Sequence, residues 1–97
     1  MTKVYFTDHA LTDLERIFEF LTQIDPALSE ATGRQIVDAT GILQHHPLIG
    51  RPTEGNLREL VISTGRTGYV ALYRFTPEED YVDVLAVRHQ RESGFVE

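Results

Sequence analysis

Apolar side chains recur at helical spacing from Ala10 to Ile24, and a second stripe runs from Leu28 to Leu43 and continues to His46. Thr7 or Asp8 precedes the first stretch as a helix N-cap, and Pro47 stops the second. Between them, Asp25-Pro26 ends one helix and begins the next, with Asp as N-cap and Pro at the first helical position. Two helices joined by almost no loop must lie side by side, so the pattern predicts a helical hairpin.

Polar residues of the first predicted helix form its expected water-facing side: Asp13, Glu15, Arg16 and Glu19. In the second helix, Gly33 and Gly41 each cost about 1 kcal/mol relative to alanine. Small residues at these two positions are expected to let the helices approach each other closely.

A β-type run at residues 4–6 precedes the helices, and a loop rich in Pro and Gly follows them over residues 47–56. Three further strand-like runs come after that loop: Leu57–Ser63, Tyr69–Thr76 and Tyr81–Val87. Short turn-like separators between such runs are typical of an antiparallel meander. The order predicts one α+β domain over residues 1–97, a helical hairpin packed on a small antiparallel sheet of three or four strands.

The middle run of the three carries apolar side chains on both of its faces. Alternate residues of a strand point to opposite faces. One face carries Tyr69, Ala71, Tyr73 and Phe75, and the other carries Val70, Leu72 and Arg74. The hairpin can cover one face only, so we expect the second, edged by arginine, to remain for a partner or for the chain's own tail. Tyr69 and Tyr73 share a face, and we expect these amphipathic rings to serve a protein interface rather than catalysis.

Composition limits the chemistry that this chain can perform. There is no cysteine, which excludes disulfides and Cys-based metal sites. The formal net charge is −6, from nine basic and fifteen acidic residues, which argues against holding nucleic acid by its phosphates. No apolar run approaches the ~18 residues of a membrane span and no signal-peptide pattern begins the chain, so we expect a cytoplasmic protein.

Arginine supplies eight of the nine basic residues, and this side chain pairs well with carboxylate or phosphate. Arg58, Arg66 and Arg74 form either an anion-binding edge or charges that keep sheets from aggregating. Near the end of the chain, Arg88, His89 and Arg91 form either a partner-contacting cluster or a solvated tail. His45-His46 are adjacent, so their rings diverge on a helix and do not hold one metal; no metal or cofactor is expected.

Three segments resemble the RelE/ParE superfamily of type II toxin–antitoxin toxins in their residues and spacing. They are Leu57-Arg58-Glu59-Leu60, Gly68-Tyr69-Val70-Ala71-Leu72-Tyr73-Arg74, and Val84-Leu85-Ala86-Val87-Arg88-His89-Gln90-Arg91-Glu92. The likeness covers essentially the whole chain and implies a toxin that a partner antitoxin neutralises. In such families the antitoxin's C-terminal segment folds into an exposed groove as a helix or a strand.

The superfamily implies two activities. RelE-like members cleave messenger RNA on the ribosome with basic residues and often a tyrosine or histidine, whereas ParE-like members poison DNA gyrase. Lys3 is the single lysine here, and the last sixteen residues hold no tyrosine, with Phe95 near its place. These features favour a ParE-like gyrase poison that is not an enzyme, paired with a ParD-like antitoxin and showing no sequence-specific binding of nucleic acid.

Two alternatives stay open. In a RelE-like endoribonuclease, the resemblance implies that Arg66, Arg88, His89 and Arg91 would share the charge and proton work. In the other, the chain is an inactive interaction module of the same fold. For the favoured reading, the expected contacts with target or antitoxin are Arg58, Arg66, Tyr69, Tyr73, Arg74, Arg88, His89 and Arg91. Because the chain is acidic, we expect a chiefly apolar antitoxin arm with Arg or Lys contacts to Asp13, Glu15 or Glu19.

Overall fold

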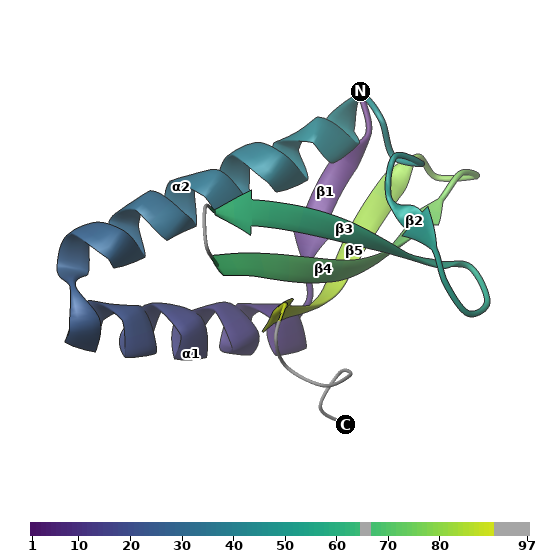
Figure 1. Ribbon diagram of the computed structural model, residues 1–97. Coiled ribbons are helices and arrows are strands. Elements are labelled where there is room, and N and C mark those ends of the chain that lie inside the picture. Colours follow the sequence, from purple (N-terminus) through teal and green to yellow (C-terminus); the bar gives the residue numbers. More distant parts are fainter. Residues whose placement is uncertain (65–66, 91–97) are drawn as a thin grey trace.

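A computed structural model describes residues 1–64 and 67–90 (Figure 1). Its elements in chain order are β1 (Lys3–Phe6), α1 (Asp8–Ile24), α2 (Pro26–Gly41), the 3-10 helix η1 (Ile42–Gln44), β2 (Arg51–Pro52), β3 (Leu57–Thr64), β4 (Thr67–Thr76) and β5 (Tyr81–His89). The α+β class and the strand-helix-helix-strand order are confirmed. Within this part of the chain, no helix is long and apolar enough to cross a membrane.

The sheet has five strands in the order β1-β5-β4-β3-β2, rather than three or four. β3, β4 and β5 form the predicted antiparallel meander. The prediction of an antiparallel sheet missed the parallel pairing of β1 with β5, which the helical hairpin allows by acting as a crossover. It also missed β2, because two residues of the Pro- and Gly-rich loop pair with Arg58 and Glu59 of β3.

Local capping explains where the helices begin. The Thr7 hydroxyl accepts a hydrogen bond from the Ala10 amide at 3.2 Å, and the Asp25 carboxylate accepts one from the Ala27 amide at 3.0 Å. The second helix ends at Gly41, earlier than predicted, and continues as η1. At Gly33 an added Cβ would lie 3.6 Å from the Phe18 ring, so this glycine does sit at the close approach of the two helices.

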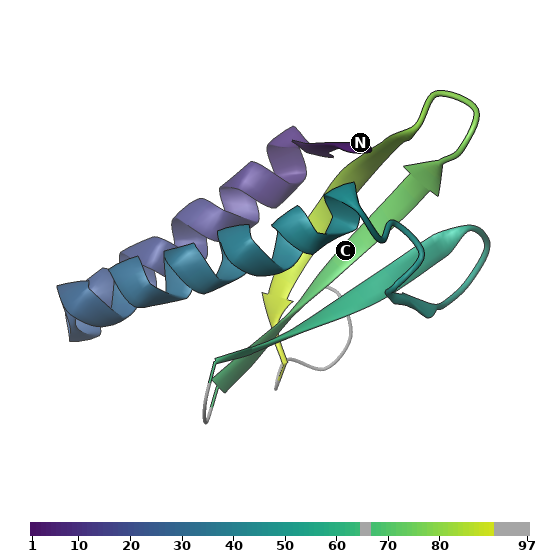
Figure 2. The ribbon, with the colours of Figure 1, turned by 90° about the horizontal axis from the view of Figure 1, so that it is seen from above.

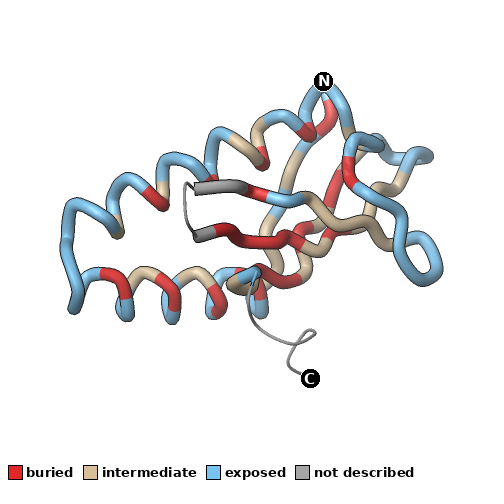
Figure 3. Tube along the Cα trace, viewed as in Figure 1, coloured by how far each residue is buried: buried red, intermediate tan, exposed pale blue. Residues whose placement is uncertain are grey.

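Both helices lie on the same side of the sheet (Figure 2). α1 packs over β5 and α2 over β3. The core lies between the two layers (Figure 3), and its fully buried large side chains are Tyr73, Ile36, Leu43, Val82, Val84 and Val87. One face of the sheet is thus covered by the hairpin, as predicted.

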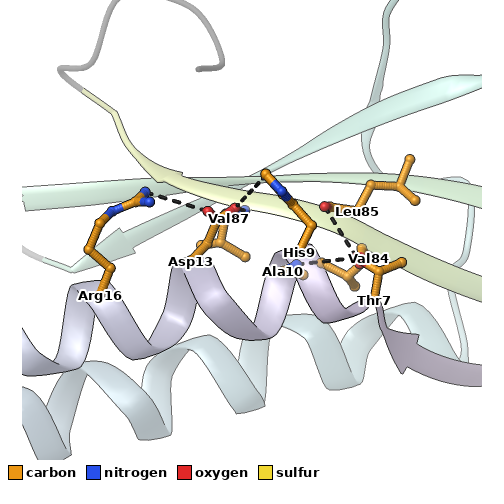
Figure 4. A network of polar contacts seen from close by, with 8 residues as sticks. All are labelled: Thr7, His9, Ala10, Asp13, Arg16, Val84, Leu85 and Val87. Carbon is orange, nitrogen blue, oxygen red and sulfur yellow. Dashed lines mark hydrogen bonds and ion pairs between the residues drawn. The ribbon is translucent and has the colours of Figure 1, made fainter. Parts of the chain in front are cut away.

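The N-terminal half of α1 closes the edge of β5 (Figure 4). β1 pairs with β5 only as far as Val84. Beyond that point the Thr7 hydroxyl donates to the carbonyls of Val84 and Leu85, at 3.2 and 3.3 Å, and Asp13 Oδ2 accepts the Val87 amide at 2.9 Å. Side chains of the helix therefore replace a neighbouring strand, as the backbone groups of a buried edge require.

The prediction that Asp13 faces water is wrong, since its exposed fraction is 5%. Its carboxylate lies 3.5 Å from His9 Nε2 and 3.5 Å from Arg16 Nη2, and both of these partners are largely exposed. Asp13 occupies the buried stripe of α1 between Ala10 and Ile17. A carboxylate is tolerated there because the Val87 amide needs an acceptor.

Replacing Asp13 with alanine is expected to lower the free energy of unfolding by about 1–3 kcal/mol, because it leaves the Val87 amide buried without an acceptor. Glu15→Ala, which removes the same charge at an exposed position two residues along α1, is expected to stay within about 0.5 kcal/mol of wild type. Urea unfolding of the three proteins measures both values. Equal losses in the two variants would show that Asp13 does not hold the β5 edge.

Candidate functional site

The structure describes six of the eight predicted contact residues and places them in two groups. Arg66 and Arg91 lie outside the described residues, as does the tail over residues 91–97. Tyr69 and Tyr73 lie beneath the hairpin, with exposed fractions of 4% and 0%. Arg58, Arg74, Arg88 and His89 are half-buried on β3, β4 and β5.

Tyr73 anchors the loop that links η1 to β2. Its hydroxyl accepts a hydrogen bond from the Gly50 amide at 2.8 Å and donates one to the Pro47 carbonyl at 2.8 Å. A Cβ at Gly50 would lie 2.5 Å from that hydroxyl and 2.9 Å from the Glu59 carbonyl oxygen, so only glycine fits. Tyr73 is a core residue, and the prediction that it faces a partner is wrong.

Arg58 holds the same loop from β3. Its Nη1 donates to the carbonyls of Leu48 and Gly50, at 3.0 and 2.8 Å. With both bonds in place, Leu48 and Ile49 stand out from the surface with more than half of each side chain exposed. The structure therefore gives Arg58 a loop-anchoring role.

Tyr69 packs edge-on against His89, with ring centroids 5.4 Å apart and an interplanar angle of 85°. Its ring is buried in the core with Ile62, the residue opposite it on β3. The predicted interface role of Tyr69 is therefore wrong as well. Sequence alternation placed the two tyrosines on one face correctly, and that face is the one that the helices cover.

We call the side of the sheet opposite the helices the outer face. The strand register assigns to it Leu57, Glu59, Val61, Val70, Leu72, Arg74, Asp83, Ala86 and Arg88. Neither helix covers it (Figure 2). Val61 exposes 47% of its surface, whereas Val70 exposes only 4%.

Two predicted arginines lie on the outer face but do not meet. Arg74 stands opposite Asp83 on β5, and Arg88 stands opposite Val70 on β4. Four residues of β4 separate the two places, which is roughly 13 Å along a strand. The face therefore offers one cation beside a carboxylate at one end and another cation at the other end, while His89 lies opposite Tyr69 on the covered face.

Metal binding is not indicated by the side chains that the structure places. Among residues 1–64 and 67–90, no three His, Cys, Asp or Glu side chains come together to hold an ion. A hollow of about 500 Å³ lies between β1 and the β4–β5 turn. Tyr5 and Tyr81 meet there edge to face, 5.9 Å apart, beside Glu79 and Asp80.

Sequence reasoning missed the polar groups that organise this architecture. Asp13 follows the spacing of an apolar stripe, and its neighbours His9 and Arg16 at helical distance were the available signal. The Tyr73 contacts join residues 23 and 26 positions apart, for which the sequence offers no local signal beyond Pro47 and Gly50 in the loop.

Known proteins resemble the chain over nearly its whole length. A family model described as the ParE toxin of the type II toxin-antitoxin system, parDE, matches residues 4–94. Toxin RelE3 of Caulobacter vibrioides is 32% identical over 92 residues, which make up 95% of this chain and 98% of that protein. The solved chromosomal ParDE system from P. aeruginosa matches with a TM-score of 0.73 at 24% identity, over 92% of this chain and 96% of that one. The RelBE2 complex from Mycobacterium tuberculosis matches with a TM-score of 0.62 at 26% identity, over 94% of this chain and 93% of that one.

These structures share their architecture with this chain: a helical hairpin packs on one face of a small sheet. This is the architecture of the RelE/ParE toxins. Because the family model covers residues 4–94, the chain belongs to the ParE toxin family of type II toxin–antitoxin systems. The resemblance stated from the strand segments is confirmed.

Burial raises the pKa of the Tyr73 phenol above its ordinary value of 10.0, an effect that the Gly50 hydrogen bond and the nearby Arg58 charge partly offset. The folded state therefore holds this proton more tightly than the unfolded state does. The resulting stability is fully present below the unfolded pKa and is lost as pH rises through the folded pKa.

Tyr73→Phe is expected to lower the free energy of unfolding by about 1–3 kcal/mol at pH 7, because Gly50 and Pro47 lose their partner. The difference from wild type should shrink as pH rises above 10.0, because the phenol of the unfolded wild-type chain ionises there while the buried phenol still holds its proton. Chemical unfolding between pH 7 and 11 measures it, with Tyr5→Phe on the exposed side as control. A difference that stays constant over this range would contradict the assigned role of the hydroxyl.

Proposed function

We propose that this toxin acts in the cytoplasm by binding DNA gyrase, without itself cutting a bond, and that a ParD-like antitoxin neutralises it. The observation that carries the proposal is the position of the tyrosines in the described part of the chain. Tyr69 and Tyr73 are buried. Tyr5 and Tyr81 lie where β5 begins, eight residues and roughly 26 Å from His89 where β5 ends.

General acid–base catalysis needs a proton donor and acceptor within hydrogen-bond reach of the reacting atoms. Within residues 1–64 and 67–90, no exposed tyrosine hydroxyl stands beside Arg88 and His89. An outer face whose two cations lie at opposite ends, one of them beside Asp83, is better suited to contact with a protein than to cleavage of RNA. This arrangement supports binding as the mode of action.

Charge supports the same choice. The net charge of −6 disfavours approach to ribosomal RNA, whose phosphates attract basic surfaces. An antitoxin partner is supported by the solved relatives, which come from a ParDE system and from a RelBE2 toxin–antitoxin complex. A chiefly apolar antitoxin arm fits the exposed apolar side chains of the hairpin and of β3.

A RelE-like endoribonuclease is the second candidate. Arg88 and His89 are adjacent, and both are half-buried at the end of β5. Their side chains point to opposite faces of the sheet, but a histidine can transfer a proton and a guanidinium can stabilise a phosphate. The Caulobacter relative also carries the name Toxin RelE3. An inactive module remains the third reading, which normal growth of cells that overproduce the chain without its partner would indicate.

The purified chain is expected to inhibit supercoiling by gyrase, and added antitoxin should relieve the inhibition. Arg88→Glu should weaken inhibition about tenfold, because it reverses a charge on the outer face. Arg34→Glu makes the same change on an exposed part of α2, and it should alter inhibition less than about twofold.

In vitro translation run beside the supercoiling assay separates the candidates. The proposal predicts intact messages at toxin concentrations that block gyrase. Unaffected supercoiling together with new cuts in translated messages would establish the endoribonuclease instead.

A further inference from the structure

A second hollow lies at the end of the sheet where β2, β3 and β4 meet (Figure 1). Its volume is about 250 Å³, and it opens between the η1–β2 loop, the β2–β3 loop and the end of β4. Arg58 is the one charged residue among the eight that line it. Five of the eight are apolar: Leu48, Pro52, Leu57, Phe75 and Pro77. The hollow is therefore an apolar surface with a single cation in its wall.

Arg58 has no counter-ion among residues 1–64 and 67–90. It is half-buried, yet no carboxylate oxygen in this part lies within 4.0 Å of its guanidinium, and the neighbouring Glu59 pairs with Arg51 at 2.7 Å. Glu54 and Glu78 adjoin lining residues in the sequence, but neither of them lines the hollow. Since a guanidinium binds a carboxylate more strongly than it binds a neutral acceptor, the site lacks an anion that another molecule can supply.

The η1–β2 loop uses only part of the Arg58 guanidinium. Nη1 donates to the carbonyls of Leu48 and Gly50, which occupies both of its N–H groups. A guanidinium has five N–H groups, so one on Nε and two on Nη2 remain. Within the described part of the chain these three donors have no partner, and none of them is sealed from solvent. Nε and Nη2 form the planar fork that holds both oxygens of a carboxylate.

Hydrogen bonds of the chain itself hold the walls of the hollow in place. The Tyr73 hydroxyl fixes the η1–β2 loop. Across the β2–β3 loop, the Thr53 amide donates to the Leu57 carbonyl at 2.9 Å, and the Leu57 amide donates to the Glu54 carbonyl at 3.2 Å. A site that is already ordered loses little conformational entropy when a ligand enters it.

We propose that this hollow binds a segment of the toxin's target protein in which a carboxylate lies beside a bulky apolar side chain. The apolar side chain fills the space between Leu48, Leu57 and Phe75, and the carboxylate pairs with the free fork of Arg58. The inference rests on the proposed function for the identity of the target, DNA gyrase. It adds the place of contact and the chemistry of the segment that binds there.

Charge separates the target from the other candidate occupants. A toxin with a net charge of −6 favours an antitoxin arm of apolar and basic side chains, and such an arm fits the exposed apolar residues of the hairpin. The hollow requires an acidic group instead. A second copy of the chain has acidic groups, but the equal net charge of the two copies opposes their association.

Small probes test the chemistry of the hollow in the wild-type chain. N-acetyl-leucine joins an apolar side chain to a carboxylate, whereas N-acetyl-leucinamide lacks the charge and acetate lacks the side chain. In an NMR titration, N-acetyl-leucine should shift the amide signals of Leu57 and Phe75 and the Nε–H signal of Arg58. It should bind at least about tenfold more tightly than either control. Equal binding of N-acetyl-leucine and its amide, or no shift at these residues, would overturn the proposal.

Leu48→Glu tests the same site against gyrase. It places a carboxylate in the wall beside Arg58 and keeps the backbone carbonyl that Arg58 binds. Ile49→Glu is the matched control, because it makes the same change at the next residue, which is equally exposed (56% against 57%) and does not line the hollow. Leu48→Glu should weaken inhibition of supercoiling about tenfold or more, and Ile49→Glu less than about twofold. Both variants should bind the antitoxin encoded beside the gene as tightly as wild type does.

The possible results separate the inference from the proposed function. If the wild-type chain inhibits gyrase and the two variants inhibit it equally well, the inference fails and the proposed function stands. Loss of antitoxin affinity in Leu48→Glu, with inhibition unchanged, would overturn the inference in favour of the antitoxin. Probe binding that appears only after removal of residues 91–97 would overturn it in favour of the chain's own Phe95-Val96-Glu97. If the wild-type chain does not inhibit gyrase, the inference and the proposed function fail together.

Discussion

Backbone hydrogen bonding at the two long edges of the sheet is the constraint on which the rest of the structure depends. A two-helix hairpin can lie on one face of five strands, and it satisfies an edge only where one of its side chains reaches. α1 reaches β5 through Thr7 and Asp13, whereas α2 presents small and apolar side chains over β3. Within residues 1–64 and 67–90, the helices therefore cover one face of the sheet and leave the outer face uncovered.

The same one-sided packing decides which residues can contact a target. Tyr69 and Tyr73 lie on the covered face, where Tyr73 fixes the loop at Gly50 and Tyr69 packs against His89. The cations of the outer face are Arg74 and Arg88, set at opposite ends of β4. Separated charges on a partly apolar face favour recognition of a large partner over chemistry at a single point.

Periodicity and turn residues predicted most of this fold from the sequence. The N-cap Asp25, the hairpin and the β3–β5 meander follow from local patterns and agree with the structure, which also chooses Thr7 over Asp8 as the first N-cap. Local patterns could not predict the parallel pairing of β1, the burial of Asp13 or the Tyr73–Gly50 contact, since each depends on residues far apart in the chain. The alternation of side chains along β4 showed that Tyr69 and Tyr73 share a face of the sheet, but it could not show that the helices cover this face. For Arg66 and Arg91, the sequence still provides the only evidence.

Amide exchange at Val87, compared between wild type and Asp13→Ala, tests the central claim most directly. Because this amide donates to Asp13 Oδ2 at 2.9 Å, it should exchange at least about 100-fold faster in Asp13→Ala, whereas Glu15→Ala should leave its exchange rate unchanged. Equal exchange rates in wild type and Asp13→Ala would contradict the claim that a side chain of α1 satisfies the β5 edge.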